Sequence, residues 1–244
     1  MNKKLSLLLG LIGIVVTASA TPVCPSGGSL STYLASGYSC QLGDDIFSNF
    51  SYSSSASGGA TAVAASGITV YTEGPGSDAH FGYSSNGFQF TASWDATAGQ
   101  ATDSNIGYTI TTTGHAQLED FFLGEAGPPT NAVTPDGAAT VTENGCGPAP
   151  CTPNQFSAEV WMYGGPNYIY NFKPTDEVTF PLTDSATMDE VINVTGGANG
   201  DAHLNLVNNA FSELIIPEPM SAGFVGAGLA LLGICCLRRR EAKA

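Results

Sequence analysis

Positive charge is nearly absent from the main part of this sequence. Of its seven Lys and Arg residues, only Lys173 lies between residues 21 and 216, a stretch that holds 19 of the 21 Asp and Glu residues. The stretch therefore has a formal charge of about −18, which would repel nucleic-acid phosphates and anionic lipid surfaces. We expect neither as a partner. A strong negative charge also keeps an exported protein soluble without implying any ligand.

The common catalytic motifs are missing as well. The chain has no G-x-S-x-G nucleophile elbow, no H-E-x-x-H zinc motif and no glycine loop of the kind that cradles phosphates. The three histidines, His80, His115 and His203, lack the spacing of metal ligands. We therefore predict no catalytic residue, no metal site and no cofactor.

Acidic residues occur in three adjacent pairs, but adjacency does not make a glycosidase site. Such a site needs two carboxylates about 5 to 9 Å apart that face each other, whereas neighbours on a strand point to opposite faces. We expect these acids to be solvated surface groups or weak calcium ligands in loops. The pairs are Asp44 with Asp45, Glu119 with Asp120, and Asp189 with Glu190.

Long apolar runs occur only at the two ends of the chain. At the start, "MNKK" is followed by a short apolar run and by Ala18 and Ala20, the small residues of a signal-peptidase site. This pattern predicts a signal peptide over residues 1–20 and a mature protein that begins at Thr21. A retained anchor would need a longer run, and a lipoprotein linked through Cys24 would need a small-residue lipobox in place of "TPV".

The cysteines fall into two groups. Four lie in the body of a chain that we expect to enter an oxidising compartment, so they should form disulfides with one of three connectivities. We favour pairing between neighbours; the first bridge would close a loop of about 15 residues and contribute about 3 kcal/mol. A zinc site with four cysteine ligands would show two C-x2-C pairs instead. The predicted bridges are Cys24–Cys40 and Cys146–Cys151.

Short alternating runs predict an all-β body, because no stretch has a convincing helical period. In residues 87–94 and in residues 155–163, larger apolar side chains occupy every second position. The second of these strands places Trp161 and Tyr163 on the face opposite its apolar residues. Weaker strand patterns begin at Ile46, Ile68, Ile106, Ala138, Glu177, Glu190 and Ala202.

Nine or so short strands joined by polar turns predict a two-sheet β-sandwich or jelly roll, formed by residues 21–216 as a single domain. The Gly- and Pro-rich breaks are interpreted as loops, because strand patterns resume within a few residues. The longest of them, residues 124–137, is predicted to be a flexible surface loop.

The C-terminal tail has three parts in a fixed order. "PEP" at Pro217, Glu218 and Pro219 is followed by an apolar segment, residues 220–237, and then by Arg238, Arg239 and Arg240. A helix of this length spans about 27 Å, enough to cross the hydrocarbon core, and the arginines would hold its end in the cytoplasm. On hydropathy alone the tail would be a plain C-terminal anchor.

This order of motif, helix and basic end resembles the PEP-CTERM sorting signal of exported bacterial proteins. The resemblance implies that the three residues of "PEP" are the recognition motif for exosortase, a membrane-embedded processing enzyme, and that the three arginines are the stop signal. It also implies cleavage near the motif and transfer to the cell surface or exopolysaccharide matrix. The segment from Cys40 to Tyr52, with "GD" and "FSNFSY", is similar to a group of such proteins, which implies a shared fold but no activity.

Two functions from different classes follow from these patterns, and a third is kept open. The leading hypothesis is a non-enzymatic protein of the cell surface or extracellular matrix, anchored in the inner membrane as a precursor. The alternative is a carbohydrate-binding surface module, in which Trp161 and Tyr163 form a platform for a sugar ring of an exopolysaccharide. The other interpretation of these two aromatic residues is that loops partly cover both faces of the strand, so that neither ring is a binding platform. A secreted hydrolase is the third hypothesis.

Overall fold

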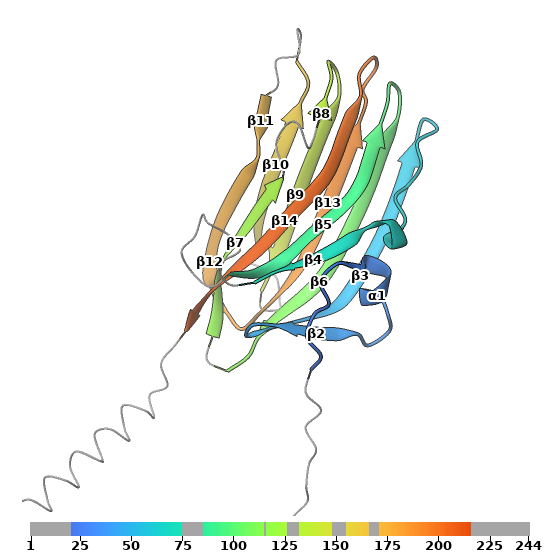
Figure 1. Ribbon diagram of the computed structural model, residues 1–244. Helices are drawn as coiled ribbons and strands as arrows, with labels where there is room; N and C mark the ends of the chain where they lie inside the picture. The colour runs from blue at the N-terminus through green and yellow to red at the C-terminus, as the bar shows by residue number, and fades with distance from the viewer. Residues whose placement is uncertain are drawn as a thin grey trace, which may run out of the picture.

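Two antiparallel sheets packed face to face form the body in a computed structural model, as expected for a β-sandwich (Figure 1). The structure describes residues 21–74, 85–114, 116–125, 132–147, 155–165 and 171–215. Within these ranges the strand order is β11-β10-β9-β13-β6-β3-β2 in one sheet, called sheet A. In the other, sheet B, the order is β1-β4-β5-β14-β7-β12, and β8 pairs with β14.

Seven strands form each sheet in the described residues. Those of sheet A are β2 (Ser39–Leu42), β3 (Asp45–Ser57), β6 (Ala101–Thr112), β9 (Ala138–Cys146), β10 (Gln155–Tyr163), β11 (Asn171–Lys173) and β13 (Ser185–Thr195). Those of sheet B are β1 (Gly28–Ser29), β4 (Thr69–Glu73), β5 (Ser85–Ala96), β7 (Ala116–Glu125), β8 (Ala132–Val133), β12 (Thr175–Thr183) and β14 (Ala202–Ile215). Helical structure is limited to α1 (Leu30–Tyr33) and a 3-10 turn, η1 (Ala65–Gly67).

All nine strands expected from the sequence are present, and the two strongest have the expected faces. In β5 the residues Phe88, Phe90, Ala92 and Trp94 are buried. In β10 the buried residues are Phe156, Ala158, Val160 and Met162. Strand β7 was not expected, because "EDFFLGE" has buried residues in succession in place of a clean alternation. Residues 124–137 were predicted to form one long loop, but part of this segment is in strands: β7 extends to Glu125, and β8 begins at Ala132.

The first predicted disulfide is present. Cys24 and Cys40 are bonded, with their Cα atoms 4.7 Å apart, which fastens the segment before β1 to strand β2. Cys146 is also disulfide-bonded, but its predicted partner Cys151 lies outside the described residues, so that pairing stays a prediction.

Polar side chains join the two sheets through the core. The indole N–H of Trp94 in sheet B donates to Ser104 Oγ in sheet A at 3.0 Å. In sheet A, Tyr108 Oη donates to Glu143 Oε1 at 2.8 Å. The amide nitrogen of Asn209 in sheet B donates to Glu190 Oε2. Each bond satisfies a buried donor, and the bonds of Trp94 and Asn209 also fix the position of one sheet over the other.

The expectation that the paired acids are solvated is wrong for Asp45 and Glu190, and two acids outside the pairs, Glu125 and Glu143, are buried as well. Asp45, Glu143 and Glu190 have no exposed surface and Glu125 is 6% exposed. The reason is alternation: Asp44 and Asp189 point outward, so their neighbours Asp45 and Glu190 point into the core. The expected opposition within these pairs is therefore confirmed, whereas the expected solvation is not.

Glu143 and Glu190 are directly opposite each other on β9 and β13. Burial raises the pKa of the Glu143 carboxyl well above its usual range, and the nearby Glu190 raises it further. Burial also raises the pKa of Glu190, against the opposing effect of the Asn209 amide. We conclude that the folded core holds these carboxyls in protonated form more readily than the unfolded chain does.

The folded protein should therefore lose stability as the pH rises. The raised pKa values of its buried glutamates stabilise the fold. This stabilisation is complete below the pKa of glutamate in the unfolded chain, about 4, and is lost as the pH rises through the pKa values of the folded protein. One proton of difference lowers the melting temperature by about 3 to 5 °C per pH unit. Thermal melts of the full chain between pH 5 and pH 8 measure this slope.

Glu190→Gln should flatten the slope, because glutamine keeps the shape and cannot ionise. Glu159→Gln, at an exposed outward position on β10, is the matched control and should leave the slope unchanged, because Glu159 does not act on either buried carboxyl. A melting temperature that is constant or increases with pH in the wild type would contradict this account of the core.

Candidate functional site

The outward side chains of sheet A form a broad polar surface, which we call the outer face. Alternation places about every second residue of β3, β6, β9, β10 and β13 on it, although the pairing of β3 shifts register between Ser48 and Ser51 and β6 buries three residues in succession. In β10 the buried and exposed positions alternate without a break, and β13 follows the same pattern. The outer face therefore follows directly from the pleat once the inward residues are fixed by the core.

An aromatic pair lies on this face at one end of the sandwich. The rings of Trp161 and Tyr163 are stacked, with centroids 5.0 Å apart and an interplanar angle of 28°. Both lie on the face of β10 opposite its buried residues, as expected from the sequence. Trp161 is half-buried and Tyr163 is 40% exposed. The described residues thus leave an aromatic surface open to solvent beside polar neighbours.

A row of side chains crosses sheet A from this pair, at right angles to the strands. Trp161 is opposite Lys173 on one side and Thr140 on the other. Thr140 is opposite Asn193, Asn193 is opposite Asp103, and Asp103 is opposite Ser55. We call this set of six residues the polar row. Five steps of about 4.8 Å between strands give it a length of about 24 Å.

Hydrogen bonds hold the far end of the polar row in place. Asn193 Nδ2 donates to Asp103 Oδ1, and Ser55 Oγ donates to Asp103 Oδ2 at 3.2 Å. At the near end, Lys173 Nζ forms an ion pair with Asp176 at 2.8 Å. These contacts restrict the rotamers of the groups that would meet a ligand, which lowers the entropy lost on binding.

The outer face is also hollowed further along the same strands. A pocket of about 490 Å³ lies over β9, β10 and β13. Its outward polar residues include Asn144, Ser157 and Asp189, which are cross-strand neighbours in register. The outer face thus offers aromatic, amide, hydroxyl and carboxylate groups, but the strands named for it contribute no base.

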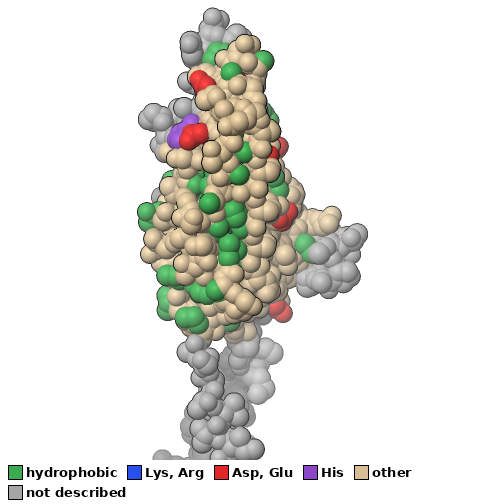
Figure 2. Space-filling view, turned by 90° about the vertical axis from the view of Figure 1, so that its right-hand side faces the viewer, with side chains coloured by type: hydrophobic (Ala, Val, Ile, Leu, Met, Phe, Trp, Pro, Cys, Tyr) green, Lys and Arg blue, Asp and Glu red, His purple; other side chains and the backbone are tan. Residues whose placement is uncertain are grey.

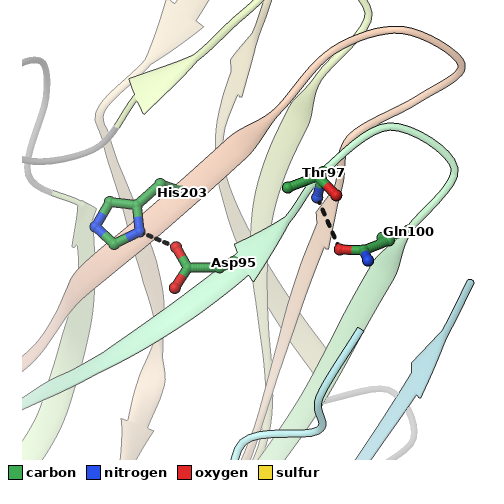
Figure 3. A network of polar contacts seen from close by, with 4 residues as sticks. All are labelled: Asp95, Thr97, Gln100 and His203. Atoms are coloured by element: carbon green, nitrogen blue, oxygen red, sulfur yellow. Dashed lines mark hydrogen bonds and ion pairs between the residues drawn. The ribbon is translucent and has the colours of Figure 1, made fainter. Parts of the chain in front are cut away.

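Of the three histidines, the structure describes His203. His203 contacts Asp95 through its Nδ1 atom, from neighbouring positions on β14 and β5 (Figure 3). The same view shows the backbone N–H of Thr97 donating to Gln100 Oε1 at 3.1 Å, which closes the turn between β5 and β6. His80 and His115 lie outside the described residues. A pocket of about 500 Å³ near this turn is lined by Asp95 and Gln100 among others.

The predicted signal peptide, residues 1–20, and the sorting segment, residues 217–244, lie outside the described residues. This includes Pro217, Glu218 and Pro219, and the three arginines Arg238, Arg239 and Arg240. Within the part of the chain that the structure describes, no helix is long and apolar enough to cross a membrane.

Acidic side chains mark the described surface seen along the β3 and β4 edge, and that view shows no Lys or Arg on it (Figure 2). The single base of the body, Lys173, lies instead on β11 at the edge of sheet A. On the side seen in Figure 2, the described surface is mostly uncharged, and its few charged side chains are acidic apart from one histidine.

Sequence reasoning found Trp161 and Tyr163 but missed the rest of the polar row. Thr140, Asn193, Asp103 and Ser55 come from four strands that are far apart in the chain. Only the register of sheet A makes them neighbours, and no spacing within the sequence reports that register.

No protein-family model and no curated protein sequence matches this chain. Several solved structures have a distantly similar arrangement. TmCBM61 in complex with β-1,4-galactotriose has 10% identity and a TM-score of 0.28, covering 68% of this chain and 88% of that one. The tailspike protein 4 domain of bacteriophage CBA120 has 18% identity and a TM-score of 0.23, covering 66% of this chain and 19% of that one.

A family 11 carbohydrate-binding module from Clostridium thermocellum, in complex with a β-1,3-1,4-mixed-linked tetrasaccharide, is also similar. It has 9% identity and a TM-score of 0.22, covering 76% of this chain and 96% of that one. Likenesses this distant assign no ligand to the present chain.

The two faces of β10 should differ sharply in their contribution to stability. Met162→Ala removes a fully buried side chain and should cost about 2 to 5 kcal/mol. Trp161→Ala removes a half-buried side chain from the outer face and should cost less than Met162→Ala despite its larger volume. Urea unfolding of the two variants measures both values. A larger loss for Trp161→Ala would mean that the tryptophan is part of the core.

Proposed function

We propose that the body is a non-catalytic carbohydrate-binding module of the cell surface, and that it binds polysaccharide on the outer face of sheet A. The observation on which this depends is the stacked pair of the half-buried Trp161 and the exposed Tyr163 at the end of the polar row. Sugar rings have an apolar C–H face that packs on aromatic rings, and hydroxyl edges that need hydrogen-bond partners. The outer face supplies both kinds of group, side by side.

The polar row supports an extended ligand rather than a single sugar. Its side chains recur once per strand, and this spacing is comparable to the repeat of an extended pyranose chain. All of them project from the same face of the sheet, so one extended chain could contact each of them. A polysaccharide lying across the strands would meet the aromatic pair first and then Thr140, Asn193 and Asp103 in turn.

The charge of the body favours a neutral polysaccharide. Asp103, Glu159 and Asp189 all lie on the outer face, and the one base, Lys173, is already paired with Asp176. A polymer of uronic acids would therefore be repelled. Neutral glycans present hydroxyl groups that carboxylate, amide and threonine side chains can all bind.

Binding is better supported than hydrolysis. The facing carboxyls Glu143 and Glu190 are fully buried and contact Tyr108 and Asn209, so a substrate in solvent has no access to them. The pocket on the outer face has one carboxylate in its lining, Asp189, whereas a glycosidase requires two that face each other.

The tail supports placement at the cell envelope. In this proposal signal peptidase removes residues 1–20, the apolar segment anchors the precursor in the inner membrane, and an exosortase-type enzyme processes the chain near Pro217 to Pro219. The described chain leaves β14 at Ile215, at the lower end of the sandwich in Figure 1. Trp161 and Tyr163 lie near the end of β10, at the opposite end of the sandwich. Tethering through the tail would therefore place the polar row at the end far from the membrane.

Retention on polysaccharide tests the binding function. In affinity electrophoresis through gels containing cellulose derivative, β-1,3-glucan or β-1,4-galactan, the full chain should be retarded by at least one of these neutral polymers and not by alginate. Trp161→Ala should weaken retention about 10- to 100-fold, as expected for the loss of a central aromatic contact.

Tyr71→Ala is the matched control, because Tyr71 is 43% exposed on β4 of the other sheet. It should leave retention unchanged. If the wild type is retarded by no polysaccharide, or if Trp161→Ala and Tyr71→Ala behave alike, the outer face is not a glycan site.

Sorting is tested by reading both termini of the protein isolated from its native envelope and medium. Mass spectrometry should find a mature start at Thr21 and loss of everything beyond the Pro217–Pro219 region. Replacing Glu218 with Ala should leave the precursor uncut. An intact Ala244 in the wild-type protein would make the tail a plain anchor and would remove exosortase from the proposal.

A further inference from the structure

The pocket near the β5–β6 turn forms where strand β4 is shorter than its neighbour. β4 begins at Thr69, which is opposite Thr91 on β5, whereas β5 continues to Ala96. The chain between β3 and β4 lies beside this unpaired part of β5 as a loop that includes η1, and a space of about 500 Å³ remains between them. This volume is within the range of about 300 to 1,000 Å³ that is usual for small-molecule sites.

The pocket and the polar row lie on opposite sides of the sandwich. Trp94 and Ala96 of β5 are buried in the core. The alternating residues Ser93 and Asp95, which line the pocket, therefore project outward from sheet B. Trp161 and the rest of the polar row project outward from sheet A. Because the two sheets pack face to face, a ligand in the pocket and a ligand on the polar row would not meet.

Contacts with the rest of the sandwich hold the loop wall of the pocket in place. Tyr52 Oη donates a hydrogen bond to the carbonyl oxygen of Val63 at 2.6 Å. A Cβ atom at Gly58 would collide with the carbonyl of Gly99, so glycine allows the loop to contact the β5–β6 turn. The shape of the pocket is thus formed before a ligand arrives, which lowers the entropy lost on binding.

Two polar side chains of the lining are held by one atom and present another to a ligand. Gln100 Oε1 accepts the backbone N–H of Thr97 at 3.1 Å, so the amide presents its Nε2 hydrogens (Figure 3). This nitrogen lies toward Gly59, where a Cβ atom would be 3.9 Å away from it. Asp95 contacts His203 through Oδ1, which leaves its Oδ2 as an acceptor.

This lining suits a neutral sugar. A donor amide and an acceptor carboxylate in one pocket can bind two neighbouring hydroxyl groups of a pyranose, since a hydroxyl both donates and accepts. The hydroxyls of Thr61 and Ser93 add further partners, and the methyl groups of Ala60 and Ala62 provide apolar contact. The described residues of the lining include no Lys or Arg, and Asp95 would repel a phosphate or a uronate.

We propose that this pocket is a second sugar-binding site, which takes one neutral sugar unit of a polysaccharide, and that the module thereby links two polysaccharide chains. The choice of ligand rests on the proposed function, whereas the site itself shares no residue with the polar row. With one chain bound on each side, every module is a cross-link. Many weak cross-links hold a polymer network together more firmly than the affinity of either site indicates.

Saturation-transfer NMR of the full chain tests the pocket separately from the outer face. The probes are methyl β-D-glucoside, methyl β-D-galactoside and methyl α-D-mannoside, and a ligand of this size predicts a dissociation constant of about 1 to 10 mM. In Trp161→Ala, which weakens the outer face, at least one probe should still give a transfer signal. Adding Ser93→Leu, which fills the pocket, should abolish that signal. Adding Asp95→Asn should weaken binding about 10-fold.

Thr179→Leu is the matched control, because Thr179 is exposed on β12, at the other edge of sheet B from the pocket. Added to Trp161→Ala, it should leave the transfer signal unchanged. No signal from any of the three probes in Trp161→Ala, or equal signals with Ser93→Leu and Thr179→Leu, would overturn the second site. Either result leaves the proposed function standing, which fails instead if the wild type is retarded by no polysaccharide.

Cross-linking is measured by the viscosity of a solution of the neutral polymer that retards the wild type. The wild type should raise the viscosity. Ser93→Leu should still be retarded by the polymer, through the outer face, but should leave the viscosity unchanged. An equal rise with both proteins, or no rise with the wild type, would show that the pocket holds no second chain.

Discussion

The burial of acidic side chains in a chain with almost no bases is the constraint on which this structure depends. A β-sandwich closes by pressing two pleated faces together, and here the inward faces include Asp45, Glu143 and Glu190. With one base in the body, and that one engaged on β11, these groups cannot be neutralised by salt bridges. They instead accept hydrogen bonds from tyrosine and asparagine donors, and burial raises the pKa of each of these carboxyls.

The same polar contacts give the sandwich its specific alignment. Apolar faces alone allow two sheets to slide, because contact between methyl groups and rings is not directional. The bonds from Trp94 to Ser104 and from Asn209 to Glu190 connect one sheet to the other at fixed points. A fixed alignment of the core also fixes the outer face, since each outward residue is set by its inward neighbours.

The outer face and the ends of the sandwich suit different tasks. The aromatic pair and the polar row lie where β10 and β13 end. Asp45, Asn86 and Glu213 lie at the other end of the sandwich, where β14 ends. In the proposed arrangement, a protein held by its C-terminus would be attached at that lower end and would meet its ligands at the other.

Alternation in the sequence was sufficient to predict β5, β10 and seven weaker strands, and to place Trp161 and Tyr163 outward. It failed for β7, where Phe121, Phe122 and Leu123 are buried in succession and the pairing with β12 and β14 shifts register. For Asp45 and Glu190 alternation held, and the general rule that acids are exposed was what failed.

The sequence by itself determined the all-β class, the acidity of the body, the disulfide between Cys24 and Cys40 and the orientation of the aromatic pair. Each of these depends on residues that are near one another in the chain or on composition. The tertiary structure alone decided which strands are neighbours, and hence the polar row, the facing glutamates and the convergence of Asp45, Asn86 and Glu213. The physical reason is that strand order and register arise from the closing of the core, which brings together residues separated by up to 168 positions, such as Asp45 and Glu213.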